Sequence, residues 1–118
     1  MKTHKDLEVW KLAIKLAGNV YQYTEKYPKN ELFGITSQMR RASVSIGANI
    51  AEGAARQSNK EFIQFLYIAL GSASELDTLI EISRETYLNE LQDFDELQQK
   101  TTRISKMLKG LINNLKSR

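Results

Sequence analysis

The sequence predicts an all-α fold, an antiparallel up-and-down four-helix bundle formed by a single domain over residues 1–118. Apolar residues recur at spacings of three and four along four stretches, which is the periodicity of amphipathic helices. The only proline, Pro28, falls between the first two stretches, and little of the chain shows the apolar–polar alternation typical of strands. The connections between stretches are short, so consecutive helices are expected to be antiparallel neighbours.

The first helix is expected over residues 6–26. Asp6 is a candidate N-cap, because its carboxylate could accept a backbone N–H of the first turn. The residue before a proline is disfavoured in the α region, so the helix should end near Tyr27 and Pro28. Its predicted buried stripe is Leu7, Trp10, Ile14, Ala17, Tyr21 and Thr24, widened by Val9, Leu16 and Val20.

The second helix is expected over residues 32–55, beginning after Asn30 or after Gly34. Its apolar stripe is Ile35, Met39, Ala42, Ile46, Ile50 and Gly53, beside a row of small residues, Ser43, Gly47, Ala51 and Ala55. A glycine inside a helix costs about 1 kcal/mol relative to alanine. Close approach of another helix to the small residues could offset that cost, so we expect this helix to be the most enclosed of the four.

The third helix is expected over residues 59–83 and the fourth over residues 91–115. Ser58 and Glu61 have the spacing of a capping box at the start of the third helix. Between the two helices the periodicity breaks, and Tyr87 and Leu88 are interpreted as an anchored loop. The predicted buried residues are Phe62, Phe65, Leu66, Ala69, Ala73, Leu76 and Ile80, then Leu97, Ile104, Leu108, Leu111 and Leu115.

Composition argues against common catalysis. The chain has no cysteine and one histidine, His4, so it lacks a thiolate site, a histidine-based triad and a multi-histidine metal site. No phosphate-binding glycine pattern occurs. We therefore predict no catalytic residue, no cofactor, no metal and no small-molecule substrate. No apolar run approaches the ~20 residues that span a bilayer, and the lack of cysteine suits the reducing cytoplasm.

The net charge of +3 is unevenly distributed. Residues 1–30 hold six bases and three acids, residues 91–118 again six and three, and residues 58–90 two bases and six acids. This segregation indicates a surface for a polyanion or subunits that meet by opposite charge, although a solvated mixed surface would look similar. The candidate nucleic-acid contacts are Lys11, Lys15, Lys26, Arg103, Lys106, Lys109 and Lys116.

A ladder of polar residues runs beside the apolar stripe of the second helix. Asn49 borders that stripe, and an unsatisfied buried amide costs on the order of 1–3 kcal/mol, so it needs hydrogen-bond partners. We expect a network that fixes helix register or a subunit contact, with a ligand or nucleic-acid site as the alternative. Its members are Arg40, Arg41, Ser45, Asn49, Glu52 and Arg56.

The same helix carries a recognisable motif, which reads approximately Q-x-R-R-A-x-x-S-I-x-x-N-I-A-E-G. The matching residues are Gln38, Arg40, Arg41, Ala42, Ser45, Ile46, Asn49, Ile50, Ala51, Glu52 and Gly53. The chain resembles the four-helix-bundle proteins named for intervening sequences in large-subunit ribosomal RNA genes. Residues 6–11 and 62–76 are also similar to that family, except that Leu70 stands where arginine is frequent.

The resemblance implies a homo-oligomer, a ring of five subunits in similar proteins. Those proteins include the nucleic-acid-binding accessory factor of diversity-generating retroelements. We therefore predict a non-enzymatic, oligomeric protein that presents a basic surface to RNA or to a nucleoprotein. The alternative is an interaction scaffold with no nucleic-acid role.

Overall fold

The computed structural model describes residues 3–87 and 93–118. In these two ranges all regular structure is helical, as predicted, and no strand occurs. The four α-helices are α1 (Glu8–Thr24), α2 (Ile35–Ala54), α3 (Asn59–Tyr87) and α4 (Phe94–Lys116). Two short 3₁₀ turns, η1 (His4–Asp6) and η2 (Lys29–Glu31), precede α1 and α2.

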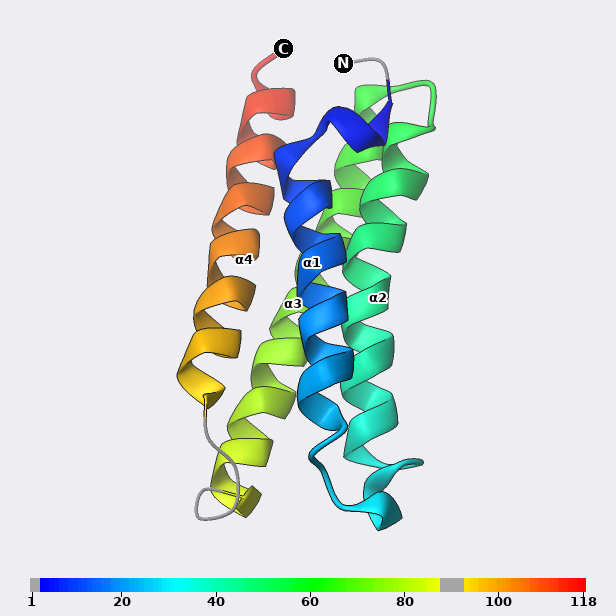
Figure 1. The fold of residues 1–118 in the computed structure, drawn as a ribbon. Helices are drawn as coiled ribbons and strands as arrows, with labels where there is room; N and C mark the ends of the chain where they lie inside the picture. Colours follow the sequence, from blue (N-terminus) through cyan, green and yellow to red (C-terminus); the bar gives the residue numbers. More distant parts are fainter. Residues whose placement is uncertain (1–2, 88–92) are drawn as a thin grey trace.

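The helices form an antiparallel up-and-down bundle that measures 48 × 21 × 19 Å (Figure 1). α1 packs between α2 and α4, and α3 closes the bundle by packing against the same two helices. The start of α1 and the end of α4 therefore lie at one end of the bundle, and η2 lies at the other. The predicted fold class is confirmed.

The core is a continuous cluster contributed by all four α-helices. Almost all of the stripes predicted for α2, α3 and α4 are buried, with Ile35, Phe65 and Leu111 only partly covered. The largest fully buried apolar side chains are Leu16, Val20, Met39, Ile46, Ile50, Leu66, Leu76, Ile80, Ile104 and Leu108.

The buried face of α1 differs from the predicted stripe. Ile14 is 48% exposed and Tyr21 is 44% exposed, although both were expected at its centre. Of the predicted stripe only Thr24 is buried, and Leu7, Trp10 and Ala17 are half-buried. The helix also buries residues that only widened the prediction or were absent from it: Val9, Ala13, Leu16, Val20 and Tyr23. Apolar residues surround more than half of α1, so periodicity alone could not orient it, and packing between α2 and α4 decides which side faces inward.

Both ends of α1 and the start of α2 lie inside the predicted limits. Asp6 does not cap α1: its carboxylate accepts the N–H of Thr3 at 3.1 Å and closes η1, while Leu7 precedes α1 without a side-chain cap. α1 ends at Thr24, whose hydroxyl donates to the carbonyl of Val20 at 2.7 Å. α2 begins after Gly34, because η2 occupies the preceding residues.

α3 is longer than predicted. The Ser58 hydroxyl accepts the N–H of Glu61 at 3.2 Å, as the capping box requires. The helix continues four residues past the expected end to Tyr87, whose hydroxyl donates to Glu31 at 2.6 Å. Tyr87 was expected in a loop but is helical. Leu88 and the expected first residues of the fourth helix, 91 and 92, lie outside the described residues; the described helix begins at Phe94.

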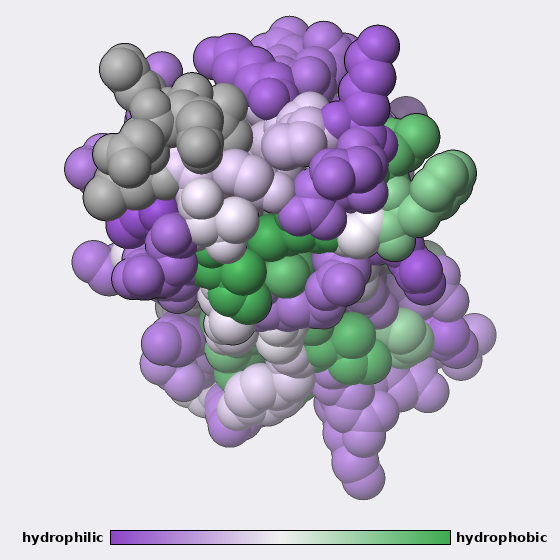
Figure 2. Space-filling model, turned by 90° about the horizontal axis from the view of Figure 1, so that it is seen from below, coloured by the Kyte–Doolittle hydropathy of each residue, from purple (hydrophilic) through white to green (hydrophobic). Residues whose placement is uncertain are grey.

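Two large apolar side chains reach solvent in the connection between η2 and α2. Phe33 is 94% exposed and Leu32 is 48% exposed. Figure 2 looks onto this end of the bundle and shows hydrophobic side chains at the surface among hydrophilic ones. Buried stripes of the helices therefore do not account for all apolar residues of the chain.

Candidate nucleic-acid interface and polar networks

The predicted polar ladder on α2 is partly formed. Asn49 donates through Nδ2 to the carbonyl of Ser45 at 2.8 Å and to the Ser45 hydroxyl at 2.9 Å. The Ser45 hydroxyl also forms a 2.8 Å hydrogen bond with the hydroxyl of Ser72 on α3. Asn49 is half-buried, as expected. Ser72 was not among the predicted members of this network, and it joins the network because α3 packs against α2 at this level.

Arg40 connects α2 to the end of α1. Its Nε donates to the Thr24 hydroxyl at 3.0 Å and its Nη2 to the Tyr21 carbonyl at 3.4 Å. The guanidinium lies 4.8 Å from the centre of the Tyr21 ring. Arg40 thus satisfies carbonyl and hydroxyl oxygens at the C-terminal end of α1, where cations are favoured.

The remaining ladder residues lie at the surface. Glu52 and Arg56, both predicted members of the network, form an i, i+4 ion pair at 2.9 Å, and the Arg56 guanidinium also lies 4.8 Å from the centre of the Phe65 ring. Arg41 lines a groove of about 410 Å³ between α2 and α3, together with Ser45 and Glu75. In the described ranges Arg41 makes no ion pair, so the polar ladder is interrupted at this residue.

Several of the predicted nucleic-acid contacts lie beside the junction of α1 and α4. A groove of about 150 Å³ between these helices has an apolar floor of Leu12, Leu16 and Ile104. Its polar lining consists of Lys15, Asn19, Lys100 and Arg103.

The cations of this α1–α4 groove differ in their partners. Lys100 forms an ion pair with Glu96 at 3.3 Å and donates to Asn19 Oδ1 at 3.1 Å. Lys15 and Arg103 have no ion pair within the described part of the chain. Lys100 was not among the predicted contacts. Its position three residues before Arg103, on the same side of α4, is the signal that could have found it.

The other predicted contacts are dispersed. Lys11 is paired with Glu8 at 3.3 Å. Lys26 lines a second α1–α4 groove that also contains Lys100, Asp93 and Glu96, so cations and acids are balanced there. Lys116 turns toward α3 and donates to the Tyr67 hydroxyl at 2.6 Å.

Lys106 shares a shallow groove along α4 with Arg103, and Lys109 is exposed on the same helix. The structure therefore brings Lys15 and Arg103 into one groove and extends this group to Lys106 along α4. Lys26 lies apart from them, in a groove of balanced charge.

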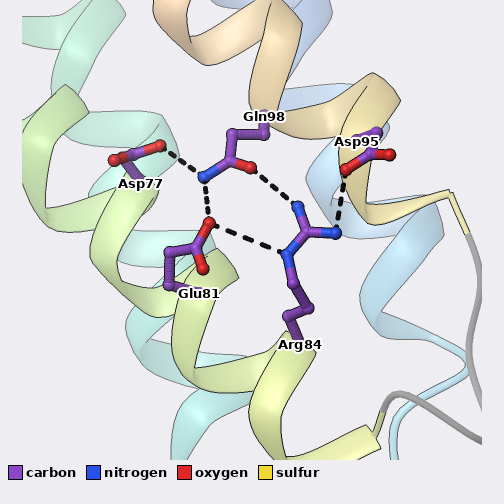
Figure 3. A network of polar contacts seen from close by, with 5 residues as sticks. All are labelled: Asp77, Glu81, Arg84, Asp95 and Gln98. Carbon is purple, nitrogen blue, oxygen red and sulfur yellow. Dashed lines mark hydrogen bonds and ion pairs between the residues drawn. The ribbon is translucent and has the colours of Figure 1, made fainter.

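A second polar network, absent from the sequence predictions, joins α3 to α4 (Figure 3). Arg84 pairs with Asp95 at 2.8 Å and with Glu81 at 3.7 Å, and donates to Gln98 Oε1 at 2.7 Å. Gln98 in turn donates through Nε2 to Asp77 at 3.0 Å and to Glu81. Arg84 and Gln98 thus hold three carboxylates from two helices together. Two of the acidic side chains of α3 are therefore used in a contact with α4.

The described residues offer little for metal chemistry or membrane insertion. Among them, no three or more histidine, cysteine, aspartate or glutamate side chains gather where they could hold a metal ion. None of the helices in these ranges combines the length and apolarity that crossing a bilayer demands.

The fold and its polar networks define a small antiparallel four-helix-bundle protein whose second helix carries the Q-x-R-R-A motif and the Ser45–Asn49 pair. The chain matches the family described as 23S rRNA-intervening sequence protein over residues 5–110 and belongs to it. It is also similar to a crystal structure of a protein with unknown function from the S23 ribosomal protein family of Bacteroides thetaiotaomicron. The sequences are 28% identical, with a TM-score of 0.77 over 88% of this chain and 97% of the other. No curated protein matches the chain.

Proposed function

We propose that this protein is a non-enzymatic, oligomeric component of the cytoplasm that binds RNA, alone or in a nucleoprotein, through the α1–α4 groove. The observation that carries the proposal is the meeting of Lys15, Lys100 and Arg103 around one groove. Lys15 and Arg103 have no anionic partner in the described residues, so phosphate groups could bind them without first breaking an ion pair.

The chemistry of the groove suits contact with the nucleic-acid backbone. Lysine and arginine neutralise phosphates and release counterions, which gives affinity with little sequence information. Asn19 and the apolar floor give the groove no pattern for reading a base edge. We therefore expect weak sequence specificity and a strong dependence on salt.

Assembly would strengthen such binding. Each chain carries a net charge of only +3, so a single copy has few cations to engage a polyanion. Several identical grooves in one particle, as in the five-subunit ring that the family resemblance suggests, would bind one RNA with an avidity above that of a single groove.

The test is a titration of labelled single-stranded RNA at several salt concentrations. We expect binding at low salt, with a logarithmic slope against salt that falls by roughly 0.7 for each phosphate contact removed. The double variant Lys15→Glu/Arg103→Glu should weaken binding and reduce the slope. Absence of binding at low salt, or binding without a salt slope, would reject the proposal.

A matched control separates local contacts from net charge. The variant Lys29→Glu/Lys60→Glu makes the same charge change at exposed residues outside the α1–α4 groove. If the groove binds RNA, this control should retain most of the affinity that the groove variant loses. Equal losses in both variants would indicate a general charge effect and no defined interface.

The second candidate function is a protein-interaction scaffold. The exposure of Phe33, Ile68 and Ile82 favours it, since large apolar side chains at the surface are typical of protein contacts. In that case charge reversal at Lys106 and Lys109 would alter assembly with a protein partner, and RNA would not bind in the titration at any salt concentration.

A further inference from the structure

Two grooves follow one another along the seam between α1 and α4. The first is the α1–α4 groove of the proposed function. The second α1–α4 groove, of about 350 Å³, shares Asn19 and Lys100 with it, so the two grooves are continuous at these residues. A strand bound in the first groove therefore meets the second groove directly beyond Lys100.

The grooves lie at different levels of the bundle. Lys15 and Arg103 line the first, whereas Lys26 and Asp93 line the second. Because α1 and α4 are antiparallel, the second groove lies toward the end of α1 and the start of α4 (Figure 1). Asp93 precedes Arg103 by ten residues, which corresponds to about 15 Å along a helix.

The charges of the two grooves also differ. The first groove is lined by three cations and by no acid. The second is lined by two cations, Lys26 and Lys100, and by two acids, Asp93 and Glu96, so these charges cancel. The positive charge of the seam therefore declines beyond Lys100, toward the start of α4.

The two acids of the second groove differ in their partners from the third acid at the start of α4. Asp95 is paired with Arg84 of α3 at 2.8 Å, so its charge is balanced outside the seam. Glu96 pairs with Lys100 at 3.3 Å, and Asp93 has no ion pair within the described part of the chain. A phosphate that passed Lys100 would meet the unpaired carboxylate of Asp93 and would compete with Glu96 for the ammonium group.

We infer that Asp93 and Glu96 limit the RNA footprint, the surface that the RNA covers, to the first groove and keep Lys26 out of contact with phosphate. The inference rests on the proposed function and assigns two positioning residues to its site. A bound strand then runs from Lys100 toward Lys106, because α4 carries no acid after Glu96.

The range of electrostatic interactions supports this limit. The Debye length is about 8 Å at physiological ionic strength, so exposed charges farther apart than this are largely screened from one another. Asp93 lines the same groove as Lys26 and offsets its charge there. It lies much farther from Arg103, about 15 Å along the helix, and leaves the attraction of Arg103 for phosphate almost unchanged.

The experiment repeats the RNA titration with the two acids neutralised. Asp93→Asn/Glu96→Gln preserves the size of both side chains and removes two negative charges from the second groove. We expect the variant to bind labelled single-stranded RNA more tightly than the wild type. Each phosphate gained should add about 0.7 to the magnitude of the logarithmic salt slope, which corresponds to about fivefold in affinity at about 0.1 M salt relative to about 1 M.

Lys26→Gln separates a new contact from a general charge effect. In the wild-type chain it should leave the affinity and the salt slope almost unchanged, because Lys26 does not touch the strand. In the Asp93→Asn/Glu96→Gln background it should remove the gained contact and lower the affinity about fivefold. Release of Lys100 from Glu96 also raises the affinity, but this gain does not depend on Lys26, so the comparison of backgrounds excludes it.

The matched control is Glu61→Gln/Glu85→Gln, which makes the same charge change at exposed residues of α3, outside both grooves. It should raise the affinity less than Asp93→Asn/Glu96→Gln and should leave Lys26→Gln without effect. Asparagine tolerates the positive φ of residue 93, 70°, as aspartate does. Circular dichroism checks that each variant retains its helix content, and Glu96→Gln alone repeats the comparison if the double variant loses helix.

The outcomes distinguish the footprint from the proposed function. If the wild-type chain binds no RNA, the proposed function is wrong and the footprint is overturned with it. If the wild-type chain binds RNA but Lys26→Gln has the same effect in both backgrounds, the footprint alone is overturned. An affinity left unchanged by neutralising the two acids would overturn the footprint in the same way.

Discussion

Gly53 of α2 lies so close to α3 that a Cβ on the glycine would be 2.6 Å from the Cβ of Phe65. It would also approach the carbonyl oxygen of Phe62 to 3.2 Å. Both neighbouring atoms are held close to the α3 backbone, so they cannot move aside by a rotamer change. The contact between α2 and α3 at this level therefore depends on the absence of a side chain at Gly53.

Gly53→Ala should destabilise the bundle. Alanine favours the helix by about 1 kcal/mol over glycine, but the added methyl group forces α2 and α3 apart, and overpacking of this kind typically costs 1–3 kcal/mol or somewhat more. We expect the free energy of unfolding to fall by about 1–2 kcal/mol. Urea denaturation followed by circular dichroism measures it.

Gly47→Ala is the matched control on the same helix. The Cβ added there would meet the terminal Cδ1 of Ile14 at 3.2 Å, and this methyl group belongs to a half-exposed side chain that can move. The substitution should leave stability unchanged or raise it by up to about 1 kcal/mol. A loss as large as that of Gly53→Ala would contradict this account of the two glycines.

The two glycines also show what the sequence could predict about α2. The row of small residues predicted a close approach of another helix: Ser43 and Gly47 are indeed buried, whereas Ala51 is half-buried and Ala55 is exposed. Gly53, predicted as part of the apolar stripe, is also buried. The pattern could not predict that α3 leaves no room for a side chain at Gly53, whereas α1 leaves room for a methyl group at Gly47. That difference depends on interhelical distance, which is set by the side chains of all four helices together.

The orientation of α1 and the polar contacts between helices could not be predicted from the sequence, for a related reason. Ile14 and Tyr21 have the spacing of buried residues, yet they lie outside because α2 and α4 cover a different side of α1. Arg84 and Gln98 lie fourteen residues apart, and their contact exists only once α3 and α4 are packed. Local periodicity is a property of a single helix, whereas these contacts depend on how two helices pack against each other.

Arg84→Met should weaken the α3–α4 contact. It removes the cation that holds Asp95 and Glu81, and it leaves the oxygen of Gln98 without its donor. Since the two carboxylates are more than half exposed, each surface ion pair contributes at most about 1 kcal/mol, and we expect a total loss of about 1–2 kcal/mol.

The salt dependence distinguishes this charge network from simple packing. Moderate salt screens exposed ion pairs, so the difference in unfolding free energy between wild type and Arg84→Met should shrink as salt is added. Arg56→Met removes another surface arginine, which directly follows α2 and, among the described residues, forms an ion pair with Glu52 of α2 alone; it should cost less than Arg84→Met. Equal costs would argue against a network that joins two helices.

The Ser45–Ser72 hydrogen bond should contribute measurably to helix register. Ser72→Ala and Ser45→Ala each remove one partner of a 2.8 Å bond between α2 and α3, and a bond of this kind contributes about 0.5–1.5 kcal/mol. A double-mutant cycle should give a coupling energy of that size between the two serines. A coupling near zero would show that the hydroxyls meet without stabilising the contact.

Tyr27 makes stability depend on pH at the alkaline end. Its hydroxyl is buried and has no hydrogen-bond partner in the described residues. Burial raises the pKa of Tyr27, an effect that the nearby Ser83 hydroxyl partly offsets, and burial also raises the pKa of Tyr23. Above about pH 10 the unfolded chain releases these protons while the folded chain retains them, so stability is complete below that pH and falls as the pH rises through the folded-state pKa.

Tyr27→Phe should therefore act in two ways. At neutral pH it removes a buried hydroxyl without a partner and should raise the free energy of unfolding by about 1 kcal/mol. Unfolding of the variant exposes one ionisable tyrosine fewer than unfolding of the wild type. Between about pH 9 and pH 11 the stability of the variant should therefore decline less steeply than that of the wild type. Urea denaturation at neutral pH and across this alkaline range measures the two effects. The control is Tyr21→Phe, which changes a half-exposed side chain and should leave the free energy of unfolding at neutral pH unchanged. If Tyr27→Phe instead lowers the free energy of unfolding, the Tyr27 hydroxyl is hydrogen-bonded in solution.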